Sequence, residues 1–196
     1  MITPPTAQLE ASIRWWVAMG SGLTPQYVMP GNSGRPAPNE SYATVLLIST
    51  SQRGRPVHVL RRDDDGIDLV ERTEAIINAR YSLQWYRGEA AADHASRFRT
   101  WAYSTQGRHS CATGRSVLPN VSEYHGIGGE FVPFVMMNLT DPARLDAIIS
   151  GDEEPRYTAT LDIQHVQVLE AALQRIAETD ILISDGISPS VTIPVQ

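Results

Sequence analysis

The side chains with the clearest capacity for chemistry are those of His109 and Cys111, which lie two positions apart in a glycine-containing stretch. An imidazole beside a thiol can hold it as a thiolate, the form of cysteine that attacks carbonyl groups and binds metals. No local sequence pattern of a cysteine nucleophile surrounds the pair, however. We therefore expect no catalytic residue. A small enzyme with a loop site near His109, Cys111 or His125 is the most distant of the alternatives.

The sequence also predicts no metal and no cofactor. Its histidines lack the paired spacing of metal ligands and are scattered over the chain, at His58, His94, His109, His125 and His165. Residues 63–66 place three aspartates before a glycine, but the alternating ligands and the closing glutamate of a calcium loop are missing. The glycines of residues 126–129 neither follow a clear strand nor precede a lysine and a hydroxyl, as a phosphate-binding loop requires.

The charged residues are more suggestive of a contact surface. The net charge of −6 disfavours a general nucleic-acid binder, and all 16 basic side chains are arginines. Two groups of opposite sign stand out as candidate subunit-interface residues: Arg97, Arg99, Arg108 and Arg115 on one side, and Asp152, Glu153 and Glu154 on the other. Opposite patches on one chain can meet head to tail and close into a ring. The alternative is two solvated faces, and the charges alone do not decide between them.

The elements that position these residues are clearest in residues 79–104, where the hydrophobic period changes across Gly88. Before the glycine, Tyr81, Leu83 and Trp85 alternate with polar residues, which predicts a strand with one covered face. After the glycine, the apolar residues recur at intervals of three and four, which predicts a helix whose buried stripe comprises Ala91, Ala95, Phe98 and Ala102. The sequence therefore places a long strand directly before a helix.

The N-terminal part predicts a helix, a loop and a meander. Leu9, Ile13, Trp16 and Val17 recur at helical spacing, and the prolines and glycines of residues 25–39 predict an extended loop. Three apolar runs follow, with a turn at residues 63–66, and indicate a small antiparallel meander of separate strands: 42–49, 57–60 and 67–70.

The C-terminal part mixes strands with a short helix. Residues 106–130 carry glycines with little periodicity and predict a second extended loop, followed by a strand over 131–137. Asp141 and Pro142 suggest the cap and first position of a helix through Ile149. Alternation over 156–168 predicts a long strand, 169–176 fits strand or helix, and the last strand pieces are expected at 181–183 and 191–195.

Length and composition fit one soluble domain. A chain of 196 residues with 42% hydrophobic and 19% charged residues can bury one core. Its one cysteine excludes an intramolecular disulfide, and no targeting segment or apolar span long enough for a bilayer is expected. We expect an α+β fold over residues 1–196, with a mostly antiparallel sheet packed by two main helices.

The strand–helix unit resembles a known family. The strand pattern Arg-Tyr-Ser-Leu-Gln at 80–84, a glycine turn, an Ala-Ala-Asp step, and a helix carrying Phe98 and Trp101 are similar to the central element of tail-terminator proteins of tailed bacteriophages, also called neck terminators. The order of elements agrees over most of residues 13–183, from the helix with Trp15 and Trp16 to the strand at 156–168. Residues 106–130 lie outside the resemblance.

The resemblance implies a non-enzymatic structural protein of the virion neck, made in the host cytoplasm. It implies a hexameric ring at the head–tail junction that caps the tail tube, ends its polymerisation and presents a surface to head-completion, connector or sheath proteins. Genomic DNA would pass through the lumen without sequence-specific binding, and no membrane would be involved. A head-completion, collar or connector adaptor of the same neck is the alternative within this class.

Overall fold

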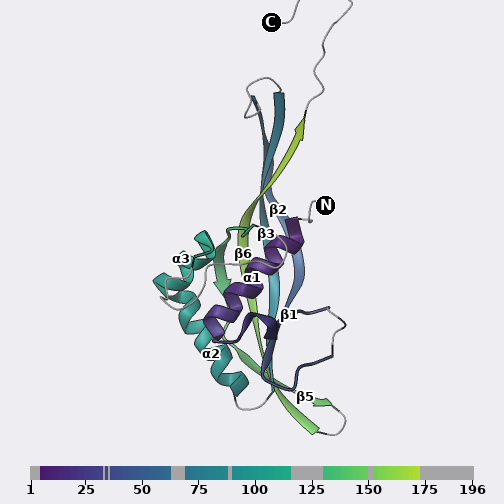
Figure 1. Ribbon diagram of the computed structural model, residues 1–196, viewed down its shortest axis with the longest axis vertical. Coiled ribbons are helices and arrows are strands. Elements are labelled where there is room, and N and C mark those ends of the chain that lie inside the picture. The colour runs from purple at the N-terminus through teal and green to yellow at the C-terminus, as the bar shows by residue number, and fades with distance from the viewer. Residues whose placement is uncertain are drawn as a thin grey trace, which may run out of the picture. The chain divides into compact units, whose positions relative to one another are not determined.

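The computed structural model describes residues 5–32, 34, 36–62, 69–87, 90–115, 130–149 and 152–172. Contacts divide the chain into two compact units, the first formed by Met1–Arg55 with Ala75–Gln167 and the second by Pro56–Glu74 with Val168–Gln196. The fold is α+β, as expected, with a mixed and mostly antiparallel sheet of six strands in the described residues and helices packed against it (Figure 1). None of the described helices is long and apolar enough to cross a membrane.

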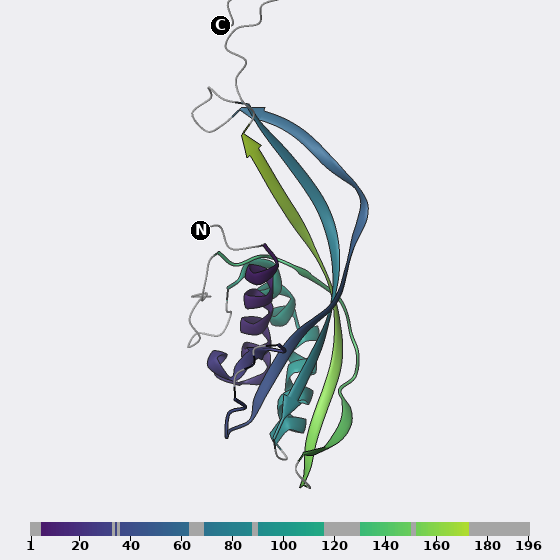
Figure 2. The ribbon, with the colours of Figure 1, turned by 90° about the vertical axis from the view of Figure 1, so that its right-hand side faces the viewer.

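The sheet is ordered β1-β2-β3-β6-β4, and β5 also pairs with β6. The strands are β1 (Val28–Pro30), β2 (Tyr42–Arg62), β3 (Leu69–Tyr86), β4 (Val135–Leu139), β5 (Ala143–Ile149) and β6 (Asp152–Ala172). Strand β1 runs parallel to β2, with Val28 opposite Ala43, whereas β4 and β5 are antiparallel to β6. In the first unit the helices all cover one face of this sheet (Figure 2).

The helices are α1 (Pro5–Ser21), α2 (Ala90–Tyr103) and α3 (Thr105–Thr113). The periodicities predicted on both sides of residue 88 are confirmed. The odd-numbered residues of β3 are buried from Ala79 to Trp85, and the predicted stripe of α2 is buried as well. Residues 88 and 89, between these elements, lie outside the described part of the chain.

Trp16 is the centre of the core of the first unit. Its side chain is fully buried, and its ring lies 5.0 Å from that of Phe98 and 5.4 Å from that of Phe134, both in edge-on geometry. Its indole N–H donates a hydrogen bond of 2.9 Å to the carbonyl of Gly107. One side chain therefore links α1 to α2, to α3 and to the segment before β4.

The predicted loop at residues 25–39 is wrong in part. A 3-10 turn, η1 (Pro25–Tyr27), leads into β1. The three residues of β1 form a parallel ladder with β2, and Val28 is buried. The prolines and glycines correctly predict interruptions of regular secondary structure. A strand as short as β1, however, is stabilised by pairing with a distant segment rather than by its own sequence.

The predicted meander is also corrected. The runs at 42–49 and 57–60 belong to the single strand β2, which continues through Gly54 and Pro56. The run expected at 67–70 reaches into β3, which extends unbroken to the strand predicted at 81–85. The turn at 63–66 lies outside the described residues. Pairing between β2 and β3 overrides the low strand propensity of residues 53–56.

Helix α3 occupies the start of the predicted loop at 106–130. The described residues therefore contain a third α-helix besides the two main helices that were expected. The hydroxyl of Ser104 accepts a hydrogen bond of 3.1 Å from the Gly107 N–H, and Gly114 ends the helix with a left-handed φ of 69°. The buried residues of α3 are small, namely Gly107, Ser110 and Cys111. A Cβ at Gly107 would lie 2.9 Å from the Cα of Ala102, so this close approach needs glycine. Residues 116–129 lie outside the description.

The helix predicted from Asp141 to Ile149 is wrong, because this segment forms β5. All seven of its residues pair with β6, from Ala143 opposite Thr158 to Ile149 opposite Asp152. The Asp141 carboxylate forms an ion pair with Arg99 and is not a helix cap. The local capping signal therefore yields to a ladder formed with a neighbouring strand.

The other C-terminal predictions are only partly tested. The strand expected at 131–137 begins at Val135, after Pro133, and the strand expected at 156–168 is confirmed and extended as β6. The open question at 169–176 is resolved through Ala172, which is strand. The pieces expected at 181–183 and 191–195 lie outside the described residues.

The second unit consists, where described, of the adjoining parts of β2, β3 and β6. The Nδ1 of His58 shares a hydrogen bond of 3.0 Å with the Thr73 hydroxyl, and it lies 3.3 Å from a carboxylate oxygen of Glu71. Several of its apolar side chains are 37–65% exposed: Val57, Val59, Leu60, Val168 and Leu169.

Candidate functional site

Two of the four predicted interface arginines have roles inside the subunit. The guanidinium of Arg97 lies against Gly22, just after the end of α1, where a cation complements the helix dipole; a Cβ at Gly22 would lie 2.5 Å from its Nη1. Arg99 forms an ion pair with Asp141 and lies 5.8 Å from the ring centre of Tyr103. Both arginines are exposed, so these contacts are expected to contribute little to stability.

The other two arginines are candidates for contacts outside the subunit. Arg108 lies on α3 and Arg115 follows that helix, and both are exposed. Within the described part of the chain, neither guanidinium has a carboxylate partner. The predicted basic cluster therefore divides into Arg99, which has a carboxylate partner, Arg97, which lies against the end of α1, and two arginines whose guanidinium groups have neither contact.

The predicted acidic residues lie at the start of β6. Asp152, Glu153 and Glu154 pair through the backbone with Ile149, Ile148 and Ala147 of β5. Their backbone positions are described, and their side chains lie outside the description. The run thus belongs to the β5–β6 ladder, away in sequence and in element from α2 and α3.

His109 and Cys111 do not form a catalytic pair. They lie two positions apart on α3, a rotation of about 200° around the helix axis, so their side chains project from nearly opposite sides of the helix. His109 is exposed, whereas Cys111 is 3% exposed and donates a hydrogen bond of 3.1 Å to the Arg108 carbonyl. Burial raises the pKa of the Cys111 thiol, which disfavours the thiolate.

Native Cys111 is therefore expected to react at least about 100-fold more slowly with a thiol reagent than the same residue in urea. The rate of reaction with a chromogenic disulfide measures this directly. Cys111→Ser retains a donor for the Arg108 carbonyl and is expected to leave assembly unchanged. Rapid native labelling, or loss of a defined turnover in Cys111→Ser, would return the enzyme alternative to consideration.

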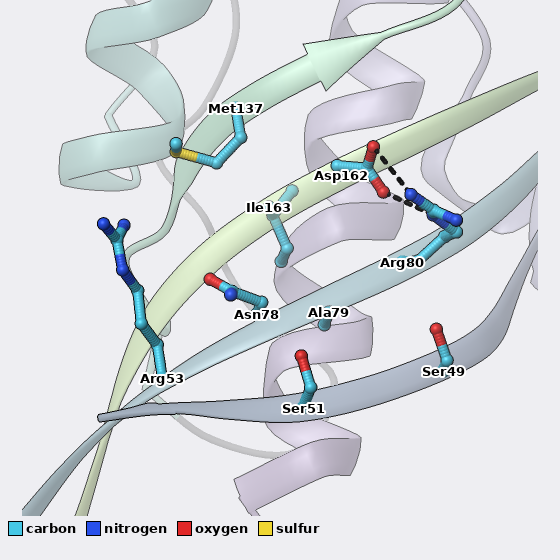
Figure 3. Close-up of a pocket in the computed structure, with 9 residues that line it drawn as sticks. All are labelled: Ser49, Ser51, Arg53, Asn78, Ala79, Arg80, Met137, Asp162 and Ile163. Atoms are coloured by element: carbon cyan, nitrogen blue, oxygen red, sulfur yellow. Dashed lines mark hydrogen bonds and ion pairs between the residues drawn. The ribbon is translucent and has the colours of Figure 1, made fainter. Parts of the chain in front are cut away.

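A polar pocket of about 530 Å³ lies on β2, β3, β4 and β6 (Figure 3). Arg80 and Asp162 point toward each other across β3 and β6 and are joined by bonds of 2.6 and 3.4 Å. Asn78 accepts a bond of 3.0 Å from Gln164, one step along the same strands. These pairs satisfy one another and stabilise the strand register, and the lining residues that the structure describes include no activated nucleophile. Among the described residues, no group of three or more His, Cys, Asp or Glu could hold a metal.

A second pocket, of about 310 Å³, contains groups that the sequence did not single out. Tyr81 and His165 both line it, and among the described residues the buried Tyr81 hydroxyl and the buried His165 Nδ1 have no hydrogen-bond partner. Burial raises the pKa of Tyr81, with a smaller contribution from the nearby Glu10, and burial lowers the pKa of His165 against a smaller opposing effect of the Val166 backbone. In the sequence, these two residues are distinguished only as polar side chains at positions where the alternation of β3 and β6 predicts burial.

The lowered pKa of His165 predicts acid sensitivity. The ordinary histidine pKa is 6.5, so below that pH the unfolded chain binds a proton that the folded chain excludes. The free energy of unfolding is therefore expected to fall with decreasing pH below 6.5, by at most about 1.4 kcal/mol per pH unit. Urea titrations of wild type and His165→Gln at several pH values measure the difference.

Glu10 has the opposite effect on the pH dependence of stability, so its contribution must be separated from that of His165. Burial raises its pKa above 4.5 while Arg14 opposes the shift, so the folded chain holds that proton more strongly and gains stability as pH falls through the raised pKa. The comparison is therefore repeated in a Glu10→Gln background. Equal pH dependence in the presence and absence of His165 would contradict the assignment.

The comparisons with known proteins identify a family. A family model described as phage neck terminator protein matches residues 7–187, nearly the whole chain. No curated protein matches. The resemblance stated from the strand–helix unit is confirmed by this match.

Proposed function

The chain belongs to the phage neck terminator protein family, whose members are structural proteins of the virion, and from this membership we propose that it caps the tail tube at the head–tail junction. In this role residues 1–196 act as one terminator-like domain that ends tube polymerisation and joins the tube to the head. The work is recognition and assembly rather than catalysis. The family match is the observation that carries the proposal.

The proposed assembly is a homo-oligomeric ring of six subunits, a number that comes from the resemblance to tail terminators. Each subunit contacts the tail tube protein on one side and head-completion, connector or sheath proteins on the other. Genomic DNA passes through the lumen without sequence readout, and a net charge of −6 limits its adhesion. The ring is made in the host cytoplasm and remains in the virion neck.

The proposed ring contact joins the acidic run at the start of β6 to the arginines of the next subunit. Arg108 and Arg115 are the partners that fit best, because Arg97 and Arg99 are already engaged within the subunit. Such a contact uses different patches on the two copies, and it closes when the rotation between neighbours divides a full turn.

Polymerisation of the purified tail tube protein in the presence and absence of this chain tests the capping role. We expect tubes that stop elongating when the chain is added, with the chain located at tube ends by labelled electron microscopy. Tubes that elongate at an unchanged rate and bind none of the added chain would refute the proposal.

A further inference from the structure

The pocket drawn in Figure 3 contains one charge that is not compensated by its neighbours. Arg80 and Asp162 are joined by two bonds, of 2.6 and 3.4 Å, so their charges cancel. Arg53 also lines the pocket, is exposed and lies apart from this pair. Within the described part of the chain, Arg53 has no carboxylate partner. The described lining thus has a surplus of one positive charge, although the chain as a whole carries −6.

Neutral hydrogen-bond donors line the same pocket. Ser49 and Ser51 of β2 are exposed, so their hydroxyls are available to a ligand. The side-chain oxygen of Asn78 accepts a hydrogen bond from Gln164, which leaves the amide N–H groups of Asn78 as donors. A guanidinium flanked by hydroxyl and amide donors is an arrangement that binds an oxyanion, such as a carboxylate or a phosphate.

The pocket lies on the open face of the sheet. Asn78 and Arg80 alternate along β3 with Ala79 and Tyr81, which belong to the hydrophobic core. The helices of the first unit all cover the other face (Figure 2). The donors of the pocket are therefore accessible to a second molecule.

An apolar edge of the pocket favours a carboxylate side chain over a nucleic-acid phosphate. Met136 and Asn138 of β4 pair with consecutive residues of β6, so Met137 is an additional residue at a bulge, and it lines the pocket. Met137 is 55% exposed, and Val135, two residues earlier, is 56% exposed. These side chains can cover the methylene groups of an acidic residue. Binding to a DNA backbone instead relies on several basic groups, and the described lining has one in surplus.

We propose that this pocket binds the carboxylate of an aspartate or glutamate that a partner protein presents to the open face of the sheet. The Arg53 guanidinium forms the ion pair, and Ser51 and Asn78 donate hydrogen bonds to the carboxylate. Met137 packs against the carbon atoms of the acidic side chain. Charge complementarity between one surplus arginine and one carboxylate identifies the occupant. All of these groups belong to one subunit, so the site does not depend on the proposed ring.

Ligand-observed NMR with two short peptides tests the proposal. The probes are acetyl-Ala-Glu-Leu-amide and acetyl-Ala-Gln-Leu-amide, which differ by one charge. An exposed ion pair is weak, so we expect the glutamate peptide to bind with a Kd of roughly 1–10 mM and the glutamine peptide to bind at least about threefold more weakly. Equal affinities of the two peptides, or no detectable binding of the glutamate peptide, would overturn the proposal.

Two substitutions on β2 locate the binding site. Arg53→Gln is expected to abolish the preference for the glutamate peptide. Arg55→Gln is the matched control, because Arg55 is equally an exposed arginine of β2 but is not part of the lining, and it is expected to keep the preference. Both variants are expected to keep the wild-type Tm, since both positions are exposed. A preference that survives in Arg53→Gln would show that the peptide binds elsewhere.

Nucleic acid is the competing occupant. Single-stranded oligothymidylate is expected not to displace the glutamate peptide from the wild-type protein. Displacement that is lost in Arg53→Gln and kept in Arg55→Gln would assign the pocket to a phosphate and overturn the carboxylate. These measurements use neither tail tube protein nor ring formation, so the failure of this proposal and the failure of the capping role are separate results.

Discussion

Trp16→Ala is expected to lower the free energy of unfolding by about 3–5 kcal/mol, the range for removing a large aromatic side chain from a core. Trp16 is 0% exposed, and its ring lies within 5.5 Å of the rings of Phe98, Trp101 and Phe134. The truncation also leaves the Gly107 carbonyl without its indole donor. Urea denaturation followed by circular dichroism measures the loss.

Two control variants separate the contributions. Trp16→Phe retains an aromatic ring but removes the hydrogen bond to Gly107, so it is expected to lose less than Trp16→Ala. Gln106→Ala changes an exposed position on the neighbouring helix and is expected to stay within about 0.5 kcal/mol of wild type. A loss below about 1 kcal/mol for Trp16→Ala would show that Trp16 is not central to the core.

Reversal of the acidic run, as Glu153→Arg with Glu154→Arg, is expected to weaken ring formation by at least about 100-fold. The change replaces attraction toward the arginines of the next subunit with repulsion, and like charges facing each other across an interface cost several kcal/mol. The ring-forming concentration, measured by light scattering at about 0.1 M salt, gives the effect, which should shrink at higher salt.

The partner assignment is tested by a compensating pair. Arg108→Glu with Arg115→Glu is expected to impair ring formation alone and to restore it in combination with the reversed acidic run. Arg55→Glu, at an exposed position of β2 outside the proposed contact, serves as the matched control for charge. Rings that form normally after reversal of Glu153 and Glu154 would refute the pairing.

The parts of the fold that the sequence predicted correctly are those encoded by large apolar residues at regular spacing. Tyr81, Leu83 and Trp85 in β3 and the buried stripe of α2 produce strong period-two and period-3.6 signals within one window. Because each signal arises from one segment, neither depends on the rest of the structure. The family resemblance rested on these same residues.

The parts that were missed depend on distant partners or small residues. Helix α3 buries Gly107, Ser110 and Cys111, whose side chains are too small to create a visible apolar stripe. The segment Ala143–Ile149 becomes a strand because β6 pairs with it, although its first residues resemble a helix start. Such pairing is a property of the assembled sheet and is absent from any local window.

For the candidate site, too, the sequence indicated residue types, whereas their contacts depended on distant parts of the chain. Charge spacing grouped the four arginines from the sequence alone, but the internal contacts of Arg97 with the end of α1 and of Arg99 with Asp141 required the packed structure. The buried polar atoms of Tyr81 and His165, which have no hydrogen-bond partner in the described part of the chain, could not be recognised from residue type alone, because burial becomes apparent only once the neighbours are known.

The mass of the purified protein in solution, by light scattering at several concentrations, alone and with tail tube protein, tests the central claim most directly. We predict a species near six times the subunit mass of 21.6 kDa, either alone or on addition of tube. A strict monomer under both conditions would contradict a ring that caps the tube.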